Sequence, residues 1–172
     1  MDRIWAPWRK SYIRPKKARE RGCLFCRLRD AKNDRQNYVI KRTAYNFAVL
    51  NRYPYNNGHV MIVPKRHVAM LDELCDVEKL DWIELLEDMI AGLKRSLRPH
   101  GFNAGMNIGQ VSGAGVPGHL HLHVVPRWSG DVNFMPIIGE TKIISESLDS
   151  VYQALTRKPR CGVRKSVERN KR

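Results

Sequence analysis

Three histidines alternate with apolar residues in the segment Gly-His-Leu-His-Leu-His-Val-Val-Pro, residues 118–126. The period of two predicts a β-strand, with Leu120, Leu122 and Val124 toward a core and the imidazoles on the opposite face. Imidazole serves proteins as a nucleophile, as an acid–base group and as a metal ligand. The segment therefore indicates a catalytic site or a metal-binding strand, and we favour catalysis.

A glycine-rich loop, residues 109–118, leads into this strand. It lacks the lysine and the following helix of a P-loop, but its main-chain N–H groups could bind an anion. A neutral imidazole can attack phosphorus without a separate base when an acceptor holds its other nitrogen protonated. Neighbouring imidazoles and amides would then stabilise charge on the phosphate oxygens. Loop and strand together suit phosphoryl or nucleotidyl transfer.

The N-terminal half of the chain predicts an antiparallel meander. Apolar alternation indicates strands at 38–42, 45–51 and 59–64, and a further strand at 102–108. No helix is expected before the third strand, so these strands should pair antiparallel. We expect a tight turn at 22–26 and a polar linker at 29–37.

One long helix is predicted at 76–97. Its apolar residues recur at steps of three and four, namely Val77, Leu80, Ile83, Leu86, Ile90, Leu93 and Leu97. Asp76 is the expected N-cap and Pro99 the expected stop. Shorter helices are expected at 67–74 and 143–156. The chain should fold as one α+β domain at 22–156, with about five antiparallel strands, this long helix and a short C-terminal helix.

The chain carries a net charge of +14, and most of it lies at the two ends. Residues 1–21 carry +6 and residues 157–172 carry +7, so the domain is nearly neutral. We interpret the C-terminal tail as a solvated, disordered charge run, and nucleic-acid binding stays a less favoured alternative. In the N-terminal arm, Trp5, Trp8 and Tyr12 should pack on the domain or on a second subunit.

The composition favours a cytoplasmic protein without a membrane contact. Apolar residues make up 42% of the chain, and no run of 18 of them exists. The N-terminus lacks the apolar region of a signal peptide. Cys23 and Cys26 form a Cys-x-x-Cys pair, which in this setting indicates metal or redox chemistry and by itself is half of a zinc site.

The segment His119-Leu-His-Leu-His123-Val-Val resembles the signature of the histidine triad family, His-φ-His-φ-His-φ-φ with φ apolar. Residues 23–26, 50–68 and 107–109 also resemble that family, in the same order and spacing, so the likeness spans roughly 22–135. The segments Trp-Ala-Pro-Trp-Arg-Lys-Ser-Tyr and Val-Val-Pro-Arg-Trp-Ser-Gly-Asp-Val-Asn-Phe resemble a bacterial branch linked to diadenosine tetraphosphate phosphorylases and hydrolases.

The resemblance implies a role for five residues of the catalytic site. His121 would be the nucleophile that forms a nucleotidyl-histidine intermediate, and His123 and His59 would flank it and stabilise the transition state. Asn51 would bind the ribose hydroxyls and Asn107 the phosphates. Each asparagine could instead make a strand-end hydrogen bond.

The resemblance also implies a zinc site. Zinc-containing members use two cysteines and two histidines, which correspond here to Cys23, Cys26, His67 and His119. Four protein ligands make a closed, tetrahedral and therefore structural site, with one Zn²⁺ per chain. His67 could instead be an ordinary surface or core histidine.

Two positions before the triad depart from the family. Many hydrolases of the family have Ser or Thr where this chain has Val116, and the phosphorylase-like branch commonly has a serine where this chain has Gly115. Both positions would lie near the substrate. The sequence leaves open whether water or inorganic phosphate completes the reaction.

The resemblance thus implies an enzyme that cleaves dinucleoside polyphosphates through His121, with an adenosine nucleotide as substrate and a homodimer as the assembly. The alternatives are a purine nucleoside phosphoramidase, a non-catalytic nucleotide sensor and an RNA-binding protein.

Overall fold

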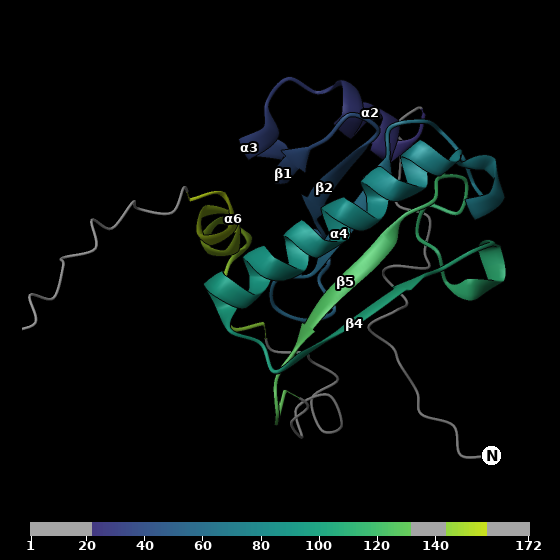
Figure 1. Ribbon diagram of the computed structural model, residues 1–172. Coiled ribbons are helices and arrows are strands. Elements are labelled where there is room, and N and C mark those ends of the chain that lie inside the picture. The colour runs from purple at the N-terminus through teal and green to yellow at the C-terminus, as the bar shows by residue number, and fades with distance from the viewer. Residues whose placement is uncertain (1–21, 132–143, 158–172) are drawn as a thin grey trace, which may run out of the picture.

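The computed structural model describes residues 22–131 and 144–157. Five strands form one antiparallel sheet in the order β1-β2-β3-β5-β4. They are β1 Val39–Arg42, β2 Asn46–Leu50, β3 Val60–Pro64, β4 Gly101–Met106 and β5 Leu122–Arg127. The long helix α4, Asp76–Leu97, crosses one face of the sheet (Figure 1). The predicted α+β fold is confirmed.

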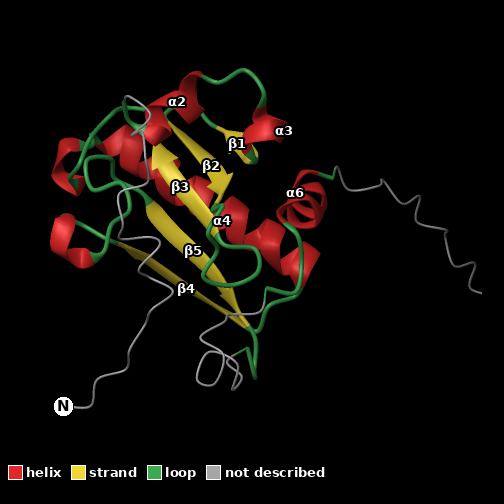
Figure 2. Cartoon of the chain, turned by 180° about the vertical axis from the view of Figure 1, so that it is seen from behind, coloured by secondary structure: helices red, strands yellow, loops and turns green. Residues whose placement is uncertain are grey.

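Among the described residues, the histidine strand β5 is the last strand in sequence order, but it lies inside the sheet. Strands β1, β2 and β3 form the expected meander, and the chain then passes through α4 to β4 (Figure 2). β5 inserts between β3 and β4, so that His123 lies opposite Met61 on one side and Gly105 on the other. Ladders on both sides hold the main chain of the strand in place.

Both faces of the sheet are covered, and the two faces have separate cores. Val60 and Val124 point toward α4 and pack with Leu85. The core on the opposite face consists of Phe25, Val39, Phe47, Val49, Met61 and Val63. Because side chains alternate along a strand, His123 lies on the same face as its partner Met61. The imidazoles therefore lie on the face opposite α4.

The helix α4 has the predicted bounds, but its buried side differs from the predicted one. Val77, Leu80 and Ile83 are 55%, 61% and 52% exposed. The buried apolar side chains are Trp82, Leu85, Met89 and Leu93. The helix has apolar residues on two sides, and the side with the larger Trp82 and Met89 packs on the sheet. Three of the seven predicted stripe residues, Val77, Leu80 and Ile83, are therefore left at the surface. Leu93 is buried as predicted, and Leu86, Ile90 and Leu97 are partly buried against the same core.

The ends of α4 are set by side chains and by one left-handed residue. The N-cap is Cys75, so the prediction of Asp76 was wrong by one residue. The Glu78 carboxylate accepts a hydrogen bond from the Cys75 N–H at 2.9 Å and pairs with Arg66 at 2.6 Å. The Arg66 contact, followed by this N–H, lowers the pKa of Glu78 to about 2. At the other end, Arg98 has a φ of 48° and closes the helix before Pro99.

The first described segment is more helical than predicted. Helix α2, Leu24–Asp30, replaces the expected turn, and Cys23 is its N-cap. Helix α3, Asp34–Asn37, lies in the expected linker, and the Asn33 side chain caps it by accepting from the Gln36 N–H at 3.0 Å. The turn prediction failed because Phe25 is buried at 1% exposure, and this burial holds the short segment on the sheet as a helix.

The remaining elements differ from the predictions mainly in length. The predicted helix at 67–74 is a single 3₁₀ turn, η2 Leu71–Glu73, because the Glu73 carboxylate takes the N–H groups of Ala69 and Met70. A second 3₁₀ turn, η3 Gln110–Ser112, lies in the glycine-rich loop. Helix α6, Leu148–Thr156, is shorter than predicted and contacts α4 and β1.

Two predictions concern segments that the structure does not describe. The N-terminal arm with Trp5, Trp8 and Tyr12 lies outside the described residues, and so does the basic tail apart from Arg157. Within 22–131 and 144–157, no helix combines the length and the apolar character needed to cross a bilayer.

Candidate active site and metal cluster

The ladder of β5 begins at Leu122, so two of the three histidines precede it. The main chain between His119 and His121 leaves the sheet because the Leu120 N–H donates to the Val68 carbonyl at 2.7 Å. The predicted orientation is confirmed, since the alternating leucines and Val124 pack in the core on the α4 side. The three imidazoles are 1%, 5% and 9% exposed in chain order.

The ring of His121 is fixed by a main-chain carbonyl. Its Nδ1 lies 2.8 Å from the carbonyl oxygen of His119. A carbonyl only accepts hydrogen bonds, so Nδ1 carries the proton and Nε2 has a free lone pair. Burial lowers the pKa of His121 and keeps the ring neutral near pH 7. These are the properties that a nitrogen nucleophile requires.

A chain of three groups fixes the ring of His123. The Tyr55 N–H donates to His59 Nδ1 at 3.1 Å, so the His59 proton lies on Nε2. That Nε2 lies 2.9 Å from His123 Nδ1 and donates to it. His123 must then carry its own proton on Nε2, and this buried atom has no hydrogen-bond partner among the described residues. It is a donor available to a substrate oxygen.

Burial also sets the charge of this donor. Loss of solvation, followed by the neighbouring His121, lowers the pKa of His123 to about 4. The ring centroids of His121 and His123 are 4.9 Å apart, and the rings are close to perpendicular at 76°. A neutral imidazole with a free nitrogen and a neutral imidazole donor therefore lie side by side on the same face of the sheet.

The loop before β3 holds His59 in place. Gly58 has a φ of +71°, and a Cβ there would lie 2.5 Å from a methyl group of Leu97, so only glycine fits. The Asn56 side chain donates to the Pro126 carbonyl at 3.1 Å and to Asp131 at 2.7 Å. The loop is thereby tied to the C-terminal end of β5.

Two aromatic rings that the sequence did not indicate border the imidazoles. The Tyr55 ring lies 4.7 Å from that of His59 and 5.5 Å from that of His123. The Phe25 ring lies 4.9 Å from that of His121 and 5.4 Å from that of His119. Each aromatic lies inside a motif noted for its other residues, and that position is the sequence signal that could have drawn attention to them.

The predicted substrate-binding residues lie at different distances from the imidazoles of His59, His121 and His123. Asn51 is adjacent, with its amide nitrogen 3.4 Å from His59 Nδ1, while its side-chain oxygen accepts from the Tyr53 N–H at 2.9 Å. Val116 packs beside the core on the histidine face. Asn107 follows the end of β4 and Gly115 is exposed in the glycine-rich loop. No hydrogen bond within the described residues joins these last two to the imidazoles.

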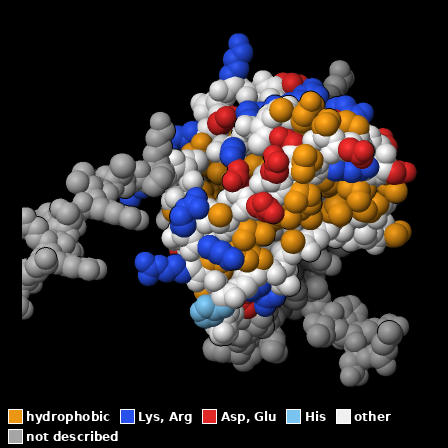
Figure 3. Space-filling model, in the orientation of Figure 1, with side chains coloured by type: hydrophobic (Ala, Val, Ile, Leu, Met, Phe, Trp, Pro, Cys, Tyr) orange, Lys and Arg blue, Asp and Glu red, His pale blue; other side chains and the backbone are white. Residues whose placement is uncertain are grey.

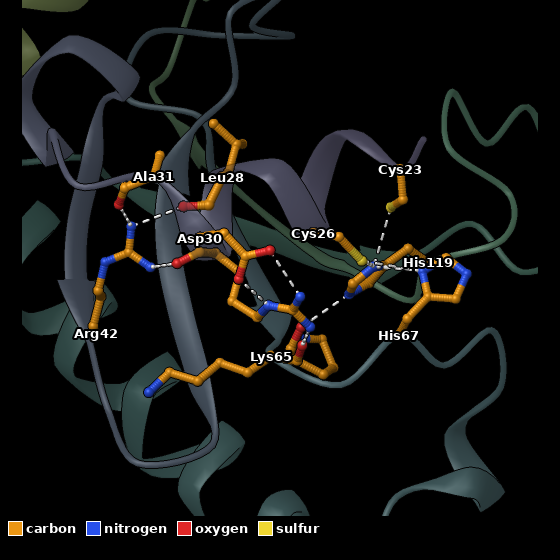
Figure 4. Close-up of polar contacts among 11 residues, drawn as sticks. Cys23, Cys26, Leu28, Asp30, Ala31, Arg42, Lys65, His67 and His119 are labelled. Atoms are coloured by element: carbon orange, nitrogen blue, oxygen red, sulfur yellow. Dashed lines mark hydrogen bonds and ion pairs between the residues drawn. The ribbon is translucent and has the colours of Figure 1, made fainter. Parts of the chain in front are cut away.

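The four predicted metal ligands come together at one point (Figure 4). Ligand atoms of Cys23, Cys26, His67 and His119 all lie within 4.8 Å of one another. His119 Nδ1 is 3.2 Å from the Cys23 sulfur, 3.7 Å from the Cys26 sulfur and 3.2 Å from His67 Nδ1. The Cys26 sulfur is 3.4 Å from His67 Nδ1.

The geometry of these atoms fits a tetrahedral ion with two sulfur and two nitrogen ligands. Tetrahedral zinc would separate its nitrogens by about 3.3 Å and its sulfur and nitrogen ligands by about 3.6 Å. His119 Nε2 donates to the Pro64 carbonyl at 2.9 Å, which leaves Nδ1 free to bind a metal. Burial, followed by the Cys23 thiol, raises the pKa of Cys26, so a bound cation would be needed to stabilise the Cys26 thiolate.

Comparison with known proteins identifies the family. The HIT domain family model matches residues 32–130. The chain is 39% identical over 162 residues to the AP-4-A phosphorylase of Mycobacterium tuberculosis, covering 90% of this chain and 83% of that protein. The chain belongs to the HIT family, and the predicted resemblance to the histidine triad family is confirmed.

Two further relatives extend this result. The chain is 29% identical to the adenosine 5'-monophosphoramidase hnt1 of Schizosaccharomyces pombe, over 61% of this chain and 74% of that protein. A crystal structure of a Zn-bound histidine triad family protein from Mycobacterium smegmatis shares the fold with a TM-score of 0.63 at 21% identity, over 78% of this chain and 91% of that one. The prediction that this chain is an enzyme of the HIT family is confirmed.

Proposed function

We propose that this protein cleaves dinucleoside polyphosphates of the diadenosine tetraphosphate type and passes the nucleotidyl group from His121 to inorganic phosphate. The observation that carries this proposal is the bond from His121 Nδ1 to the His119 carbonyl, because it leaves Nε2 as a free nucleophile. Phosphate is chosen as the final acceptor because of the 39% identity to an AP-4-A phosphorylase.

The proposed reaction has two displacements at one phosphorus. His121 Nε2 attacks the phosphorus next to one adenosine, an N–P bond forms, and the bond to the bridging oxygen breaks to release ATP. His123 Nε2–H donates a hydrogen bond to a phosphate oxygen and stabilises its charge. Inorganic phosphate then attacks the adenylyl group, releases ADP and restores the free lone pair of His121.

The substrate contacts follow from the predicted roles. Asn51 borders His59 and would bind the ribose hydroxyls. Asn107, Gly115 and Val116 would line the path of the phosphates, since the glycine-rich loop connects them to the start of the histidine segment. The alternative acceptor is water, which would give a hydrolase with the same first step.

Zn²⁺ is the proposed occupant of the cluster formed by Cys23, Cys26, His67 and His119. Two thiolates and two imidazoles suit zinc, and four protein ligands leave no coordination position open for a substrate. When bound, the ion would supply structural stabilisation and no reaction step.

A homodimer is the proposed assembly, formed through the exposed side of α4 and the outer edge of β4. Val77, Leu80 and Ile83 are each more than half exposed along α4. Figure 3 shows apolar side chains interspersed with acidic ones on this face of the molecule. β4 is last in the sheet order, so within the described residues its outer edge lacks a partner strand. An unpaired edge beside an apolar surface suits a two-fold contact with a second copy.

The assembly is tested by the mass of the protein in solution. Ile83→Asp should convert a dimer to a monomer in light scattering after size exclusion, because it buries a charge in the contact. Tyr53→Asp, at a side chain that is 63% exposed on another part of the surface, is the matched control and should stay dimeric. A wild-type monomer would contradict the proposed dimer.

A phosphoramidase is the second candidate function. The 29% identity to an adenosine 5'-monophosphoramidase supports it, and a nucleophilic His121 serves both reactions because only the leaving group differs. The substrate would then be a nucleoside phosphoramidate.

The deciding experiment incubates the protein with diadenosine tetraphosphate, with and without inorganic phosphate, and identifies products by chromatography. The proposal requires ADP and ATP that form only when phosphate is present. AMP and ATP without phosphate would identify a hydrolase. No cleavage in either condition, together with cleavage of adenosine 5'-phosphoramidate, would favour the second candidate.

A further inference from the structure

Helix α2 and its N-cap supply two of the four proposed metal ligands, yet few interactions within the helix stabilise it. It has seven residues, and its N-cap Cys23 makes no side-chain capping bond. A helix this short is not stable alone in water, so its position depends on tertiary contacts. Phe25 is buried in its middle, and Leu28 and Cys23 pack partly on the same core. Apolar contacts are non-directional, so they do not by themselves fix the position of the helix along the sheet.

The guanidinium of Arg42 binds the C-terminal end of this helix. It donates to the carbonyls of Leu28 at 2.8 Å, Arg29 at 2.9 Å and Ala31 at 3.3 Å (Figure 4). The last carbonyls of a helix lack partners within the helix, and a cation there also complements the helix dipole. Arg42 thus binds two carbonyls of the last turn of α2 and the carbonyl of its C-cap residue Ala31 with one side chain.

Arg42 is itself fixed to the sheet and to α3. It ends β1 and lies opposite Phe47 of β2, and its guanidinium covers the Phe47 ring at 5.6 Å. The Asp34 carboxylate accepts from Nη2 at 2.7 Å and from Nε at 3.0 Å. Arg42 is therefore a rigid link between α2 and the sheet.

A second tie joins α2 to the segment that carries the other ligands. Arg29 of α2 donates to the Lys65 carbonyl at 3.0 Å. Lys65 lies between Pro64, whose carbonyl orients His119, and the ligand His67. Arg42 thus fixes α2 relative to the sheet, and Arg29 fixes it relative to the segment next to His67.

We propose that Arg42 is a positioning residue of the metal cluster, which places the Cys23 and Cys26 sulfurs within reach of His67 and His119. This role depends on the metal site proposed above. Arg42 contacts none of the four ligand side chains in the described hydrogen bonds, so it acts through the position of α2. A lysine cannot replace it, because one ammonium group cannot serve three carbonyls and a carboxylate in one plane.

The test measures metal affinity and the spectrum of the bound ion. Arg42→Lys should bind Zn²⁺ at least about tenfold more weakly in competition with a chromophoric chelator. With Co²⁺ as the probe, the visible bands of a tetrahedral sulfur–nitrogen site should weaken or shift in Arg42→Lys. Asp34→Asn removes the anchor of the guanidinium and should cause a smaller change in the same direction, so it serves if Arg42→Lys does not fold.

Asp81→Asn is the matched control. Asp81 binds Thr43 and Asn46 at 2.6 and 2.5 Å next to β1, so its loss should destabilise the fold without touching α2. All variants are compared at a temperature at which circular dichroism shows them folded. Asp81→Asn should keep wild-type metal affinity and the wild-type Co²⁺ spectrum.

Three results would overturn the role of Arg42, and they are distinguishable. Folded Arg42→Lys and Asp34→Asn with wild-type affinity and spectrum would remove Arg42 while leaving the metal site intact. An equal loss of affinity in Asp81→Asn would assign the effect to general destabilisation. A wild-type protein that binds neither Zn²⁺ nor Co²⁺ would remove the proposed metal site itself.

Discussion

His119 and His121 lie two residues apart, and each ring offers a different nitrogen. The Pro64 carbonyl holds His119 Nε2, so Nδ1 points toward the cysteines. The His119 carbonyl holds His121 Nδ1, so Nε2 is left for chemistry. The residue type is the same at both positions, and the acceptor carbonyl leaves free the nitrogen that suits the proposed metal ligand in one case and the proposed nucleophile in the other.

The two sites also share one residue. The side chain of His119 belongs to the proposed metal cluster, and its carbonyl holds the ring of the proposed nucleophile His121. Phe25, between the two cysteines in the sequence, contacts the rings of His119 and His121. A substitution should therefore affect the catalytic site without affecting the metal site, or the reverse, only when it leaves the main chain at His119 in place.

The largest difference between the effect on catalysis and the effect on the metal site is expected from His121→Ala. Removal of the attacking nitrogen should lower kcat at least about 10³-fold, while zinc content and the melting temperature stay close to wild type. Turnover is measured on diadenosine tetraphosphate and zinc by elemental analysis. Retention of wild-type turnover in a clean preparation would remove His121 as the nucleophile.

Cys26→Ser should have the opposite effect, with a loss of zinc and of stability as its direct consequence. Loss of one thiolate ligand should abolish stoichiometric zinc and lower the free energy of unfolding by about 3 kcal/mol or more. The control is Cys75→Ser, because Cys75 is an exposed cysteine outside the cluster. Chemical denaturation and elemental analysis give both quantities, and equal zinc in the two variants would contradict the ligand set.

His59→Phe tests the donor chain. Without the His59 Nε2–H, the proton of His123 is no longer held on Nε2, so kcat should fall about 10²-fold with little change in KM. His100→Phe is the control, since His100 is exposed and its hydrogen bond goes to Ser129, which is not part of the donor chain. A rise in KM at constant kcat would instead assign His59 to substrate binding.

The smallest expected effect is on stability in mild acid. The pKa of His123 is about 4 in the folded protein and near 6.5 when unfolded, so the unfolded chain binds the extra proton between these values. Stability should therefore fall as the pH drops from 7 to 5, with about 1–2 kcal/mol of the loss due to His123. His123→Gln should lose that part of the dependence in denaturation curves at the two pH values. An unchanged slope would mean that the ring is not desolvated.

The sequence predicted the fold well where one signal was strong and less well where two signals competed. The bounds of α4 follow from its periodicity and from Pro99, and they agree with the structure. Its buried side was predicted correctly in the C-terminal half, where Leu93 is buried, and wrongly at Val77, Leu80 and Ile83. Leu80 and Trp82 both belong to apolar stripes, and only the sheet decides which stripe is covered. Helix α2 was missed because seven residues carry too little periodicity to outweigh the Cys-x-x-Cys spacing.

The candidate site shows a similar division. The alternation of histidines predicted one imidazole face, and the family resemblance brought together Cys23 and His67, which are far apart in the chain. The nitrogen that each ring offers could not be predicted, because it depends on the carbonyls of Pro64 and His119 and on the Tyr55 N–H. The sequence does not specify which main-chain carbonyl or N–H group each ring contacts.

The most direct test of the nucleophile is the mass of the intact protein after a rapid quench with diadenosine tetraphosphate in the absence of inorganic phosphate. The account predicts a gain of one adenylyl group, located on His121 by peptide mapping, absent from His121→Ala and discharged as ADP when phosphate is added. An adduct on another residue, or full turnover by a protein that never gains the group, would contradict it.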